Sequence, residues 1–294
     1  WSSDVCSSDL FVQMFNGVFN MKRLLMIIGA IYGFAMISCN GNNDADTDLA
    51  TQFSKTVSIF GIKIMATEST GEAKVIHAAK VLAQYLDNDE DGKVDNQAVV
   101  DKLTSVNATL VMFKDENEAD NFDYDGPDLD HAQGLFDDET IPSFNKNSTN
   151  SRFDASLEEV LHLITHEGYS KVYPDLAEKK GSKIANAMDK ARGGYFESPP
   201  STYPGGAWYS YDDETCEYDC MITEYFYWAL TSMMGAQGYS GRSNEIGHEW
   251  KLNTLKKVKT GDSDVYEILT DPQYKLPAIL PDGEYNGFSI SLDK

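Results

Sequence analysis

The sequence is short of positive charge. It contains 24 Lys and Arg residues against 47 Asp and Glu, so its formal net charge is −23 at pH 7. A chain of this sign repels the phosphate backbone of nucleic acids and attracts divalent cations. We therefore expect no nucleic-acid partner and look for metal ligands among the acidic residues.

Recognisable nucleotide and nucleophile motifs are also missing. We find no P-loop, no Rossmann fingerprint and no pattern that indicates a serine triad. Aromatic residues, by contrast, make up 12% of the chain, which argues against disorder. These observations leave a folded, acidic protein whose chemistry depends on carboxylates and on its 5 histidines.

An apolar segment near the N-terminus is too short to span a membrane. Residues 24–37 form an uncharged, mostly apolar run of 14, whereas a spanning helix needs about 20. The run follows Lys22 and Arg23 and ends at Met-Ile-Ser-Cys39, which resembles the lipobox of bacterial lipoproteins, with Met where Leu is more usual. This resemblance implies cleavage before Cys39, a lipid on its thiol and a lipid-anchored place in the cell envelope. The alternative is a buried apolar helix that ends in an ordinary cysteine.

The domain organisation follows from this leader. Residues 1–20 do not begin with Met and resemble translated read-through, so we exclude them from the fold. Residues 21–38 are the expected signal peptide. Residues 39–54 are polar and acidic, like the tether of Bacteroidota lipoproteins. We expect residues 55–294 to form a single globular domain.

The cysteines outside the leader are few. With Cys6 in the read-through and Cys39 lipidated, only Cys216 and Cys220 remain. Outside the cytoplasm a close pair of cysteines most simply forms a disulfide. Zinc ligation is the alternative, although structural zinc sites built from cysteine usually have four ligands.

Hydrophobic periodicity predicts an α+β fold with a small mixed sheet and packed helices. The helix at 156–169 begins with Ser156 and Glu159 in the spacing of a capping box. Strands are expected at 56–67, at 108–113 and, as an edge strand, within 132–141; helices are expected at 72–86, 97–103, 156–169, 182–191 and 220–235.

The segment DNDEDGKVD, residues 87–95, resembles the first three-quarters of an EF-hand calcium loop, and helices are expected on both sides of it. Gly92 stands at position 6, where the loop turns sharply. Ala98 occupies position 12, which belongs to a bidentate Glu, so another carboxylate completes the shell or the affinity is low. The alternative is a solvated acidic turn. The expected calcium ligands are Asp87, Asp89, Asp91, the carbonyl of Lys93, and Asp95.

Two histidines stand four residues apart on the helix expected at 156–169. At this spacing His162 and His166 lie one turn apart on nearly the same face, where both imidazoles can bind one metal ion. A third ligand is suggested by Glu224, the lone charged residue on a strongly apolar helix. A buried carboxylate is costly unless it is paired or binds a metal. The alternative is a pair of hydrogen-bonded or exposed histidines.

This order of elements resembles the zincin metallopeptidases that have a glutamate as third zinc ligand. The resemblance implies zinc on His162, His166 and Glu224 and a metal-activated water that attacks an amide. The sequence departs from the HExxH motif, because Leu163 stands at the position of the general base. Glu159 or Glu167, one on each neighbouring turn, is then the candidate base.

Two functions from different classes therefore remain. One is a calcium-binding, zinc-dependent metallohydrolase with a zincin-like fold and an inserted EF-hand-like helix–loop–helix, acting on a peptide or protein outside the cytoplasm. The other is a non-catalytic, calcium-stabilised surface lipoprotein that binds glycan or protein through the aromatic loops around Trp208.

Overall fold

The computed structural model describes residues 52–124, 129–148 and 152–293. The expected read-through, the expected signal peptide, Cys39 and most of the expected tether lie outside these residues. No helix in the described ranges is long and apolar enough to cross a membrane.

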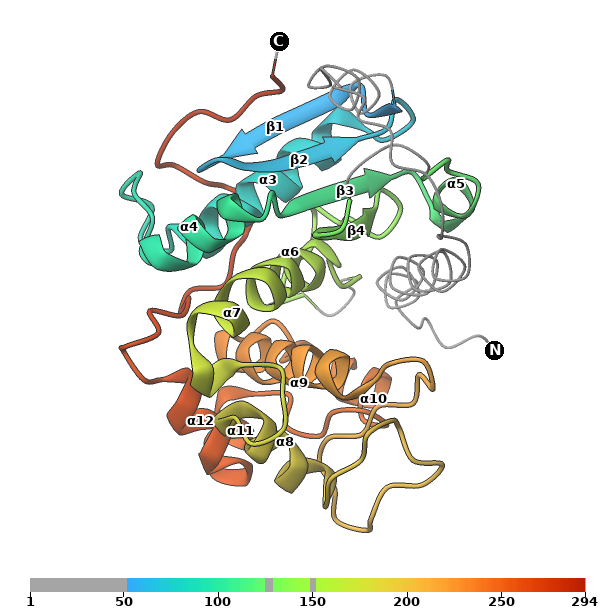
Figure 1. Cartoon of the computed structure of the whole chain (residues 1–294), viewed down its shortest axis with the longest axis vertical. Helices are drawn as coiled ribbons and strands as arrows, with labels where there is room; N and C mark the ends of the chain where they lie inside the picture. The colour runs from blue at the N-terminus through green and yellow to red at the C-terminus, as the bar shows by residue number, and fades with distance from the viewer. Residues whose placement is uncertain (1–51, 125–128, 149–151, 294) are drawn as a thin grey trace, which may run out of the picture.

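The strands form one mixed sheet in the order β1-β2-β3-β4 (Figure 1). β1 and β2 are antiparallel, and the pairs β2–β3 and β3–β4 are parallel. The expected α+β class with a small mixed sheet is confirmed, and β4 is an edge strand as predicted. The strands are β1 Lys55–Ile59, β2 Ile62–Ala66, β3 Thr109–Phe113 and β4 Ala132–Phe136.

The single strand predicted at 56–67 is wrong, because the chain reverses in its middle. Phe60 and Gly61 have φ values of 50° and 88°, and β1 and β2 form a two-residue hairpin around them. Two consecutive residues with positive φ are the conformation that joins twisted antiparallel strands most closely. The apolar alternation continues through Phe60 and conceals this turn.

The helices group into two parts along the chain. α3 has the predicted boundaries, and α9 begins two residues earlier than expected. The first part comprises α3 Glu72–Leu86, α4 Gln97–Ser105 and α5 Glu116–Asp120; the second comprises α6 Ser156–Ile164, a π-helical turn Thr165–Tyr169, α7 Ser170–Val172, a 3-10 turn Pro174–Leu176, α8 Lys183–Arg192, α9 Tyr218–Met234, α10 Arg242–Glu245, α11 Leu255–Gly261 and α12 Ser263–Leu269.

α6 lies at the centre of the molecule. It packs against α3 and β4 on one side and against α9 on the other (Figure 1). All nine of its residues are buried, and one large apolar core continues from the sheet through α6 to α9. Polar side chains on α6 are therefore held in a dry environment, where unpaired charge is costly.

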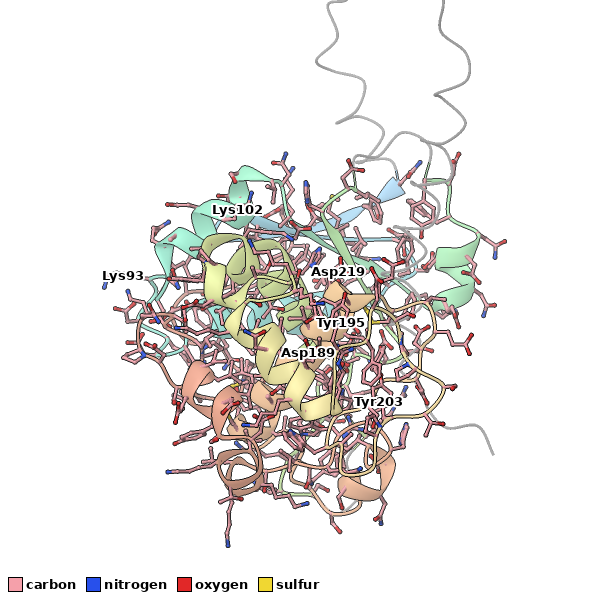
Figure 2. All side chains as sticks on the ribbon, turned by 60° about the horizontal axis from the view of Figure 1, so that its bottom comes forward. Lys93, Lys102, Asp189, Tyr195, Tyr203 and Asp219 are labelled. Carbon is pink, nitrogen blue, oxygen red and sulfur yellow. A yellow bond between two sulfur atoms is a disulfide. The ribbon has the colours of Figure 1, made fainter. Side chains whose placement is uncertain are left out.

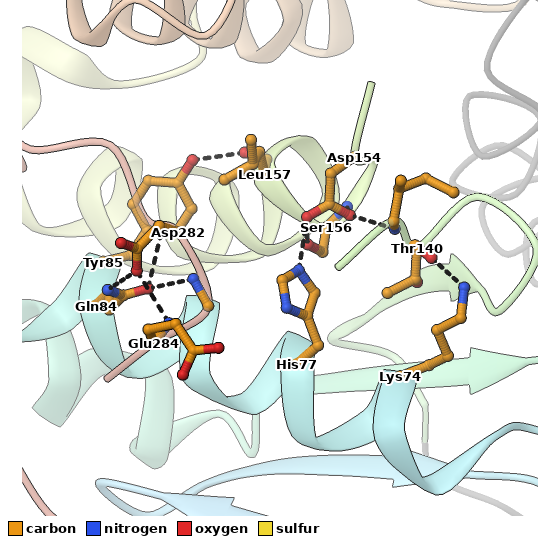
Figure 3. Close-up of polar contacts among 12 residues, drawn as sticks. Lys74, His77, Gln84, Tyr85, Thr140, Asp154, Ser156, Leu157, Asp282 and Glu284 are labelled. Carbon is orange, nitrogen blue, oxygen red and sulfur yellow. Dashed lines mark hydrogen bonds and ion pairs between the residues drawn. The ribbon is translucent and has the colours of Figure 1, made fainter. Parts of the chain in front are cut away.

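The predicted capping box at Ser156 and Glu159 does not form. The helix N-cap is Ala155, and the Ser156 hydroxyl instead donates to Asp154 at 2.7 Å. Asp154 also lies 2.7 Å from His77 Nε2 on α3 and accepts the backbone N–H of Ile141 (Figure 3). Burial alone would raise the pKa of Asp154, but these partners hold it below its ordinary value. The buried pair joins α3 to the start of α6.

The C-terminal segment 276–293 runs back over α3 toward the sheet (Figure 1). Gln84 accepts the backbone N–H groups of Asp282 and Gly283, and its amide donates to the Asp282 carboxylate (Figure 3). Asn88 accepts two further N–H groups of this segment, from residues 278 and 279. Because these side chains satisfy its backbone, the segment packs tightly without forming a strand.

The start of α9 is cross-linked to the loop before it. The Sγ atoms of Cys216 and Cys220 are 1.99 Å apart, the distance of a disulfide bond, as the sequence predicted. Cys220 lies in the first turn of α9 and Cys216 just outside the helix. The cross-link therefore fixes the loop end one helical turn before Glu224.

Candidate metal centre

Three buried side chains from two helices converge between the sheet and α9. Glu158 and His162 on α6 and Glu224 on α9 each offer one ligand atom, and these atoms all lie within 4.8 Å of one another. Their exposed fractions are 4%, 3% and 5%. The structure thus brings together two of the three residues predicted to bind zinc, and adds Glu158.

The imidazole of His162 lies between two carboxylates. Its Nε2 is 3.6 Å from Glu224 Oε1, and its Nδ1 is 3.6 Å from Glu159 Oε2. Glu159 Oε2 in turn accepts a hydrogen bond of 2.6 Å from the amide of Gln133 on β4. Tyr227, one turn after Glu224, packs edge-on against the ring with 5.4 Å between centroids. These contacts orient the ring so that Nε2 faces Glu224 and Nδ1 faces Glu159.

The donor set fits a divalent metal ion. His162 Nε2 is buried and has no hydrogen-bond partner in the described chain. Two carboxylate oxygens and one imidazole nitrogen are the ligands that zinc and related ions accept, and three protein ligands leave one position open. A carboxylate behind the ligating histidine, here Glu159, is the usual support for such a ligand.

His166 does not join this group. Its Nδ1 lies 2.7 Å from Glu178 Oε2, and 41% of its side chain is exposed. The reason is the π-helical turn at Thr165–Tyr169, because a wider turn moves the next residues off the face that carries His162. Gly168 packs closely in this turn, where an added Cβ would lie 2.8 Å from Val99 Cγ1 on α4.

Glu178 and Glu167 set the environment of His166. Burial alone would lower the pKa of His166, but the nearby Glu178 carboxylate raises it above its ordinary value. Glu167 Oε1 lies 3.5 Å from His166 Nε2, and Glu167 Oε2 lies 3.0 Å from His131 Nδ1. Glu167, one of the two predicted bases, therefore stands between two half-exposed histidines rather than beside His162.

Glu158 was missed from the sequence, although a signal for it exists. It precedes His162 by four residues, the same spacing that singled out His162 and His166. A helix places residues so spaced on one face.

The acidic loop after α3 forms a second group of candidate ligands. Carboxylate oxygens of Asp87, Asp89 and Asp91 lie within 4.8 Å of one another. Gly92 has a φ of 86°, and its N–H donates to Asp87 Oδ2 at 2.8 Å. The group does not include Asp95, whose Oδ2 accepts the N–H of residue 88.

Two further side chains, Lys93 within the loop and Tyr285 outside it, contact its carboxylates. The side chain of Lys93, whose carbonyl was the predicted ligand, lies 2.9 Å from Asp91 Oδ2. Tyr285 in the C-terminal segment donates its hydroxyl to Asp87 Oδ2. Ala98 lies in the first turn of α4 and brings no ligand. The loop is therefore in contact with the end of the chain as well as with its own helices.

Comparisons of the chain with known protein families, curated proteins and solved structures find no match.

Proposed function

We propose that this protein is an exported metallohydrolase whose zinc is held by Glu158, His162 and Glu224 and whose substrate is a peptide or protein. Zinc bound there would activate a water molecule for attack on an amide. The proposal keeps two ligands of the zincin resemblance and exchanges His166 for Glu158. The order of sheet, histidine helix and later glutamate helix supports the resemblance.

The observation that carries the proposal is the state of His162. Its Nε2 is buried without a hydrogen-bond partner among the described residues and faces Glu224, while Nδ1 faces Glu159. A buried imidazole nitrogen with no partner is unfavourable in a purely structural role. A metal ion on Nε2 would satisfy it.

The general base has to come from outside the zincin motif, because the side chain of Leu163 has no group that accepts a proton. Glu159 supports the His162 ring from the side of Nδ1, and Glu167 lies against His131 and His166 rather than beside His162, so we assign the role of base to neither.

Hydrolysis is tested with a quenched fluorescent peptide library and the zinc-loaded protein. We expect cleavage that Glu224→Gln reduces about 100-fold or more, together with a loss of bound zinc, because one of the proposed ligands is removed. Glu116→Gln, a change of the same kind on the remote α5, should leave cleavage unaffected. If the zinc-loaded protein cleaves no peptide, the hydrolase assignment is rejected. The proposed zinc site is not contradicted by that result.

We further propose that Cys39 carries the lipid that anchors the protein in the cell envelope. The basic residues, apolar run and cysteine in the expected order support this. Cells fed an alkyne-labelled fatty acid should label the wild-type protein in their membranes, and Cys39→Ser should abolish the label. Label retained in Cys39→Ser would contradict the anchor.

We also propose that the acidic loop binds calcium as a structural ion, on Asp87, Asp89 and Asp91. The convergence of three carboxylates between α3 and α4, with Gly92 at the turn, supports an EF-hand-like site. Calcium outside a cell is often millimolar, so a site of low affinity fills there.

A non-catalytic, ligand-binding role is the second candidate function. One observation favours it, a cavity of about 530 Å³ among the loops that surround Trp208. Trp208 itself donates its indole N–H to Asp262 at 2.7 Å and so supports these loops from behind.

A further inference from the structure

The cavity lies among loops rather than beside the metal centre. Its walls come from residues 199–214, between α8 and α9, and from residues 248–251, after α10. Figure 2 views the molecule from this side, with Tyr203 on the wall. Its volume of about 530 Å³ falls in the range of about 300–1,000 Å³ that holds small ligands or single side chains.

The wall is rich in hydrogen-bond acceptors. Three of the residues in 199–204 are prolines, which present a carbonyl but no N–H. Asp212 and Glu214 add exposed carboxylates, and Glu249 adds a half-buried one. These groups favour a ligand that brings hydrogen-bond donors.

Four donors of the wall have partners inside the protein. The Tyr203 hydroxyl donates to a backbone carbonyl at 2.8 Å, and the Lys251 ammonium donates to the Ala207 carbonyl at 2.5 Å. The backbone N–H of Ser210 donates to the Glu249 carbonyl at 2.8 Å. His248 Nε2 lies 3.1 Å from the Glu249 carboxylate. These four donors are therefore less available to a ligand than the carbonyls and carboxylates of the wall.

Charge points to the same kind of ligand. Asp212 and Glu214 are exposed at the rim of a chain whose net charge is −23, so cations are attracted to this cavity. The arginine guanidinium is planar and permanently charged, with five donors and no acceptor, and it stacks on aromatic rings. The half-buried ring of Tyr203 offers such a surface.

We propose that this cavity binds an arginine side chain of a peptide or protein partner. The proposal deepens the second candidate function by naming its ligand, and it is independent of the metal centre. The guanidinium lies against Tyr203 and donates to Asp212 and Glu214. The disulfide at Cys216 begins two residues after Glu214 and holds this rim in place.

Calorimetric titration with two blocked tripeptides tests whether the cavity prefers an arginine side chain. One has arginine at its centre, and the other has citrulline, which keeps the shape but loses the charge. We expect the arginine peptide to bind at least about tenfold more tightly, because charged donors form the stronger hydrogen bonds. Added salt should weaken its binding.

Matched variants test whether the arginine peptide binds at Asp212 and Glu214. Asp212→Asn with Glu214→Gln should weaken the arginine peptide about fivefold, as expected for two exposed charge pairs. Asp120→Asn with Glu267→Gln makes the same change of charge at exposed positions on α5 and α12 and should leave binding unchanged. Circular dichroism melts establish that both doubles are folded.

Each alternative outcome has a definite meaning. Equal binding of the arginine and citrulline peptides, or equal weakening by both double variants, overturns the proposal. Binding of a neutral oligosaccharide that displaces the arginine peptide overturns the ligand class but leaves the second candidate function in place. No binding of peptide or oligosaccharide at about 10 mM overturns both.

Discussion

Replacing His162 with alanine is expected to lower bound zinc from about one ion per chain to less than about 0.1, because only two carboxylates of the proposed ligand set remain. Glu158→Gln should have an effect in the same direction. Zinc content is measured by mass spectrometry of the metal after exhaustive dialysis, alongside circular dichroism to establish that each variant is folded.

His166→Ala is the matched control for this result. It removes the same side chain from the next turn of the same helical segment, but His166 lies against Glu178 rather than with Glu224. We therefore expect it to retain zinc. Loss of zinc in His166→Ala as complete as in His162→Ala, together with full retention in Glu158→Gln, would restore the ligand set of the zincin resemblance and reject ours.

The Glu159→Gln variant tests whether Glu159 supports the His162 ring or binds the metal itself. It keeps the shape and the contact with Gln133 but removes the charge behind the His162 ring. Loss of such a supporting carboxylate typically weakens metal affinity about 10- to 100-fold. At saturating zinc the Glu159→Gln variant should still bind about one zinc ion per chain. A variant that lacks one of the zinc ligands should not.

Calcium is expected to raise the melting temperature by about 5–10 °C when its concentration reaches about 100 times the dissociation constant. Binding to the native state at that level adds about 2.7 kcal/mol to the free energy of unfolding. For a domain of this size each kcal/mol corresponds to about 2–4 °C. The shift is measured by differential scanning calorimetry in EGTA and in added calcium.

Asp89→Asn and Asp120→Asn make a matched pair for this experiment. Both replace an exposed aspartate, but only Asp89 belongs to the loop group. We expect Asp89→Asn to remove most of the calcium-dependent shift and Asp120→Asn to preserve it. A melting temperature that is the same in EGTA and in calcium would reject the calcium site.

Much of the fold was predictable because its signals are local. The boundaries of α3 follow from apolar periodicity between Gly71 and Asp87, and the disulfide follows from the scarcity of other cysteines. The hairpin at Phe60 and Gly61 was not predictable in this way, since its turn interrupts no apolar pattern.

The candidate site was predictable only in part. His162 and Glu224 stand out as polar residues on apolar helices, and the structure brings them together. The position of His166 depends on a π-helical turn that packs Gly168 against α4, about 70 residues earlier in the chain. Such a contact leaves no mark in a local pattern, so helical spacing alone predicted the wrong neighbour for His162.

The C-terminal segment has a consequence for the order of events during folding. Gln84, Asn88 and Glu90 contact residues 278–286, which follow them by almost 200 positions. Contacts of such separation form late and slow the folding of a domain. A chain that is threaded across a membrane from its N-terminus delivers the acidic loop before this segment. If the protein is exported and binds calcium as proposed, the loop meets the ion before residues 278–286 have crossed and packed against it.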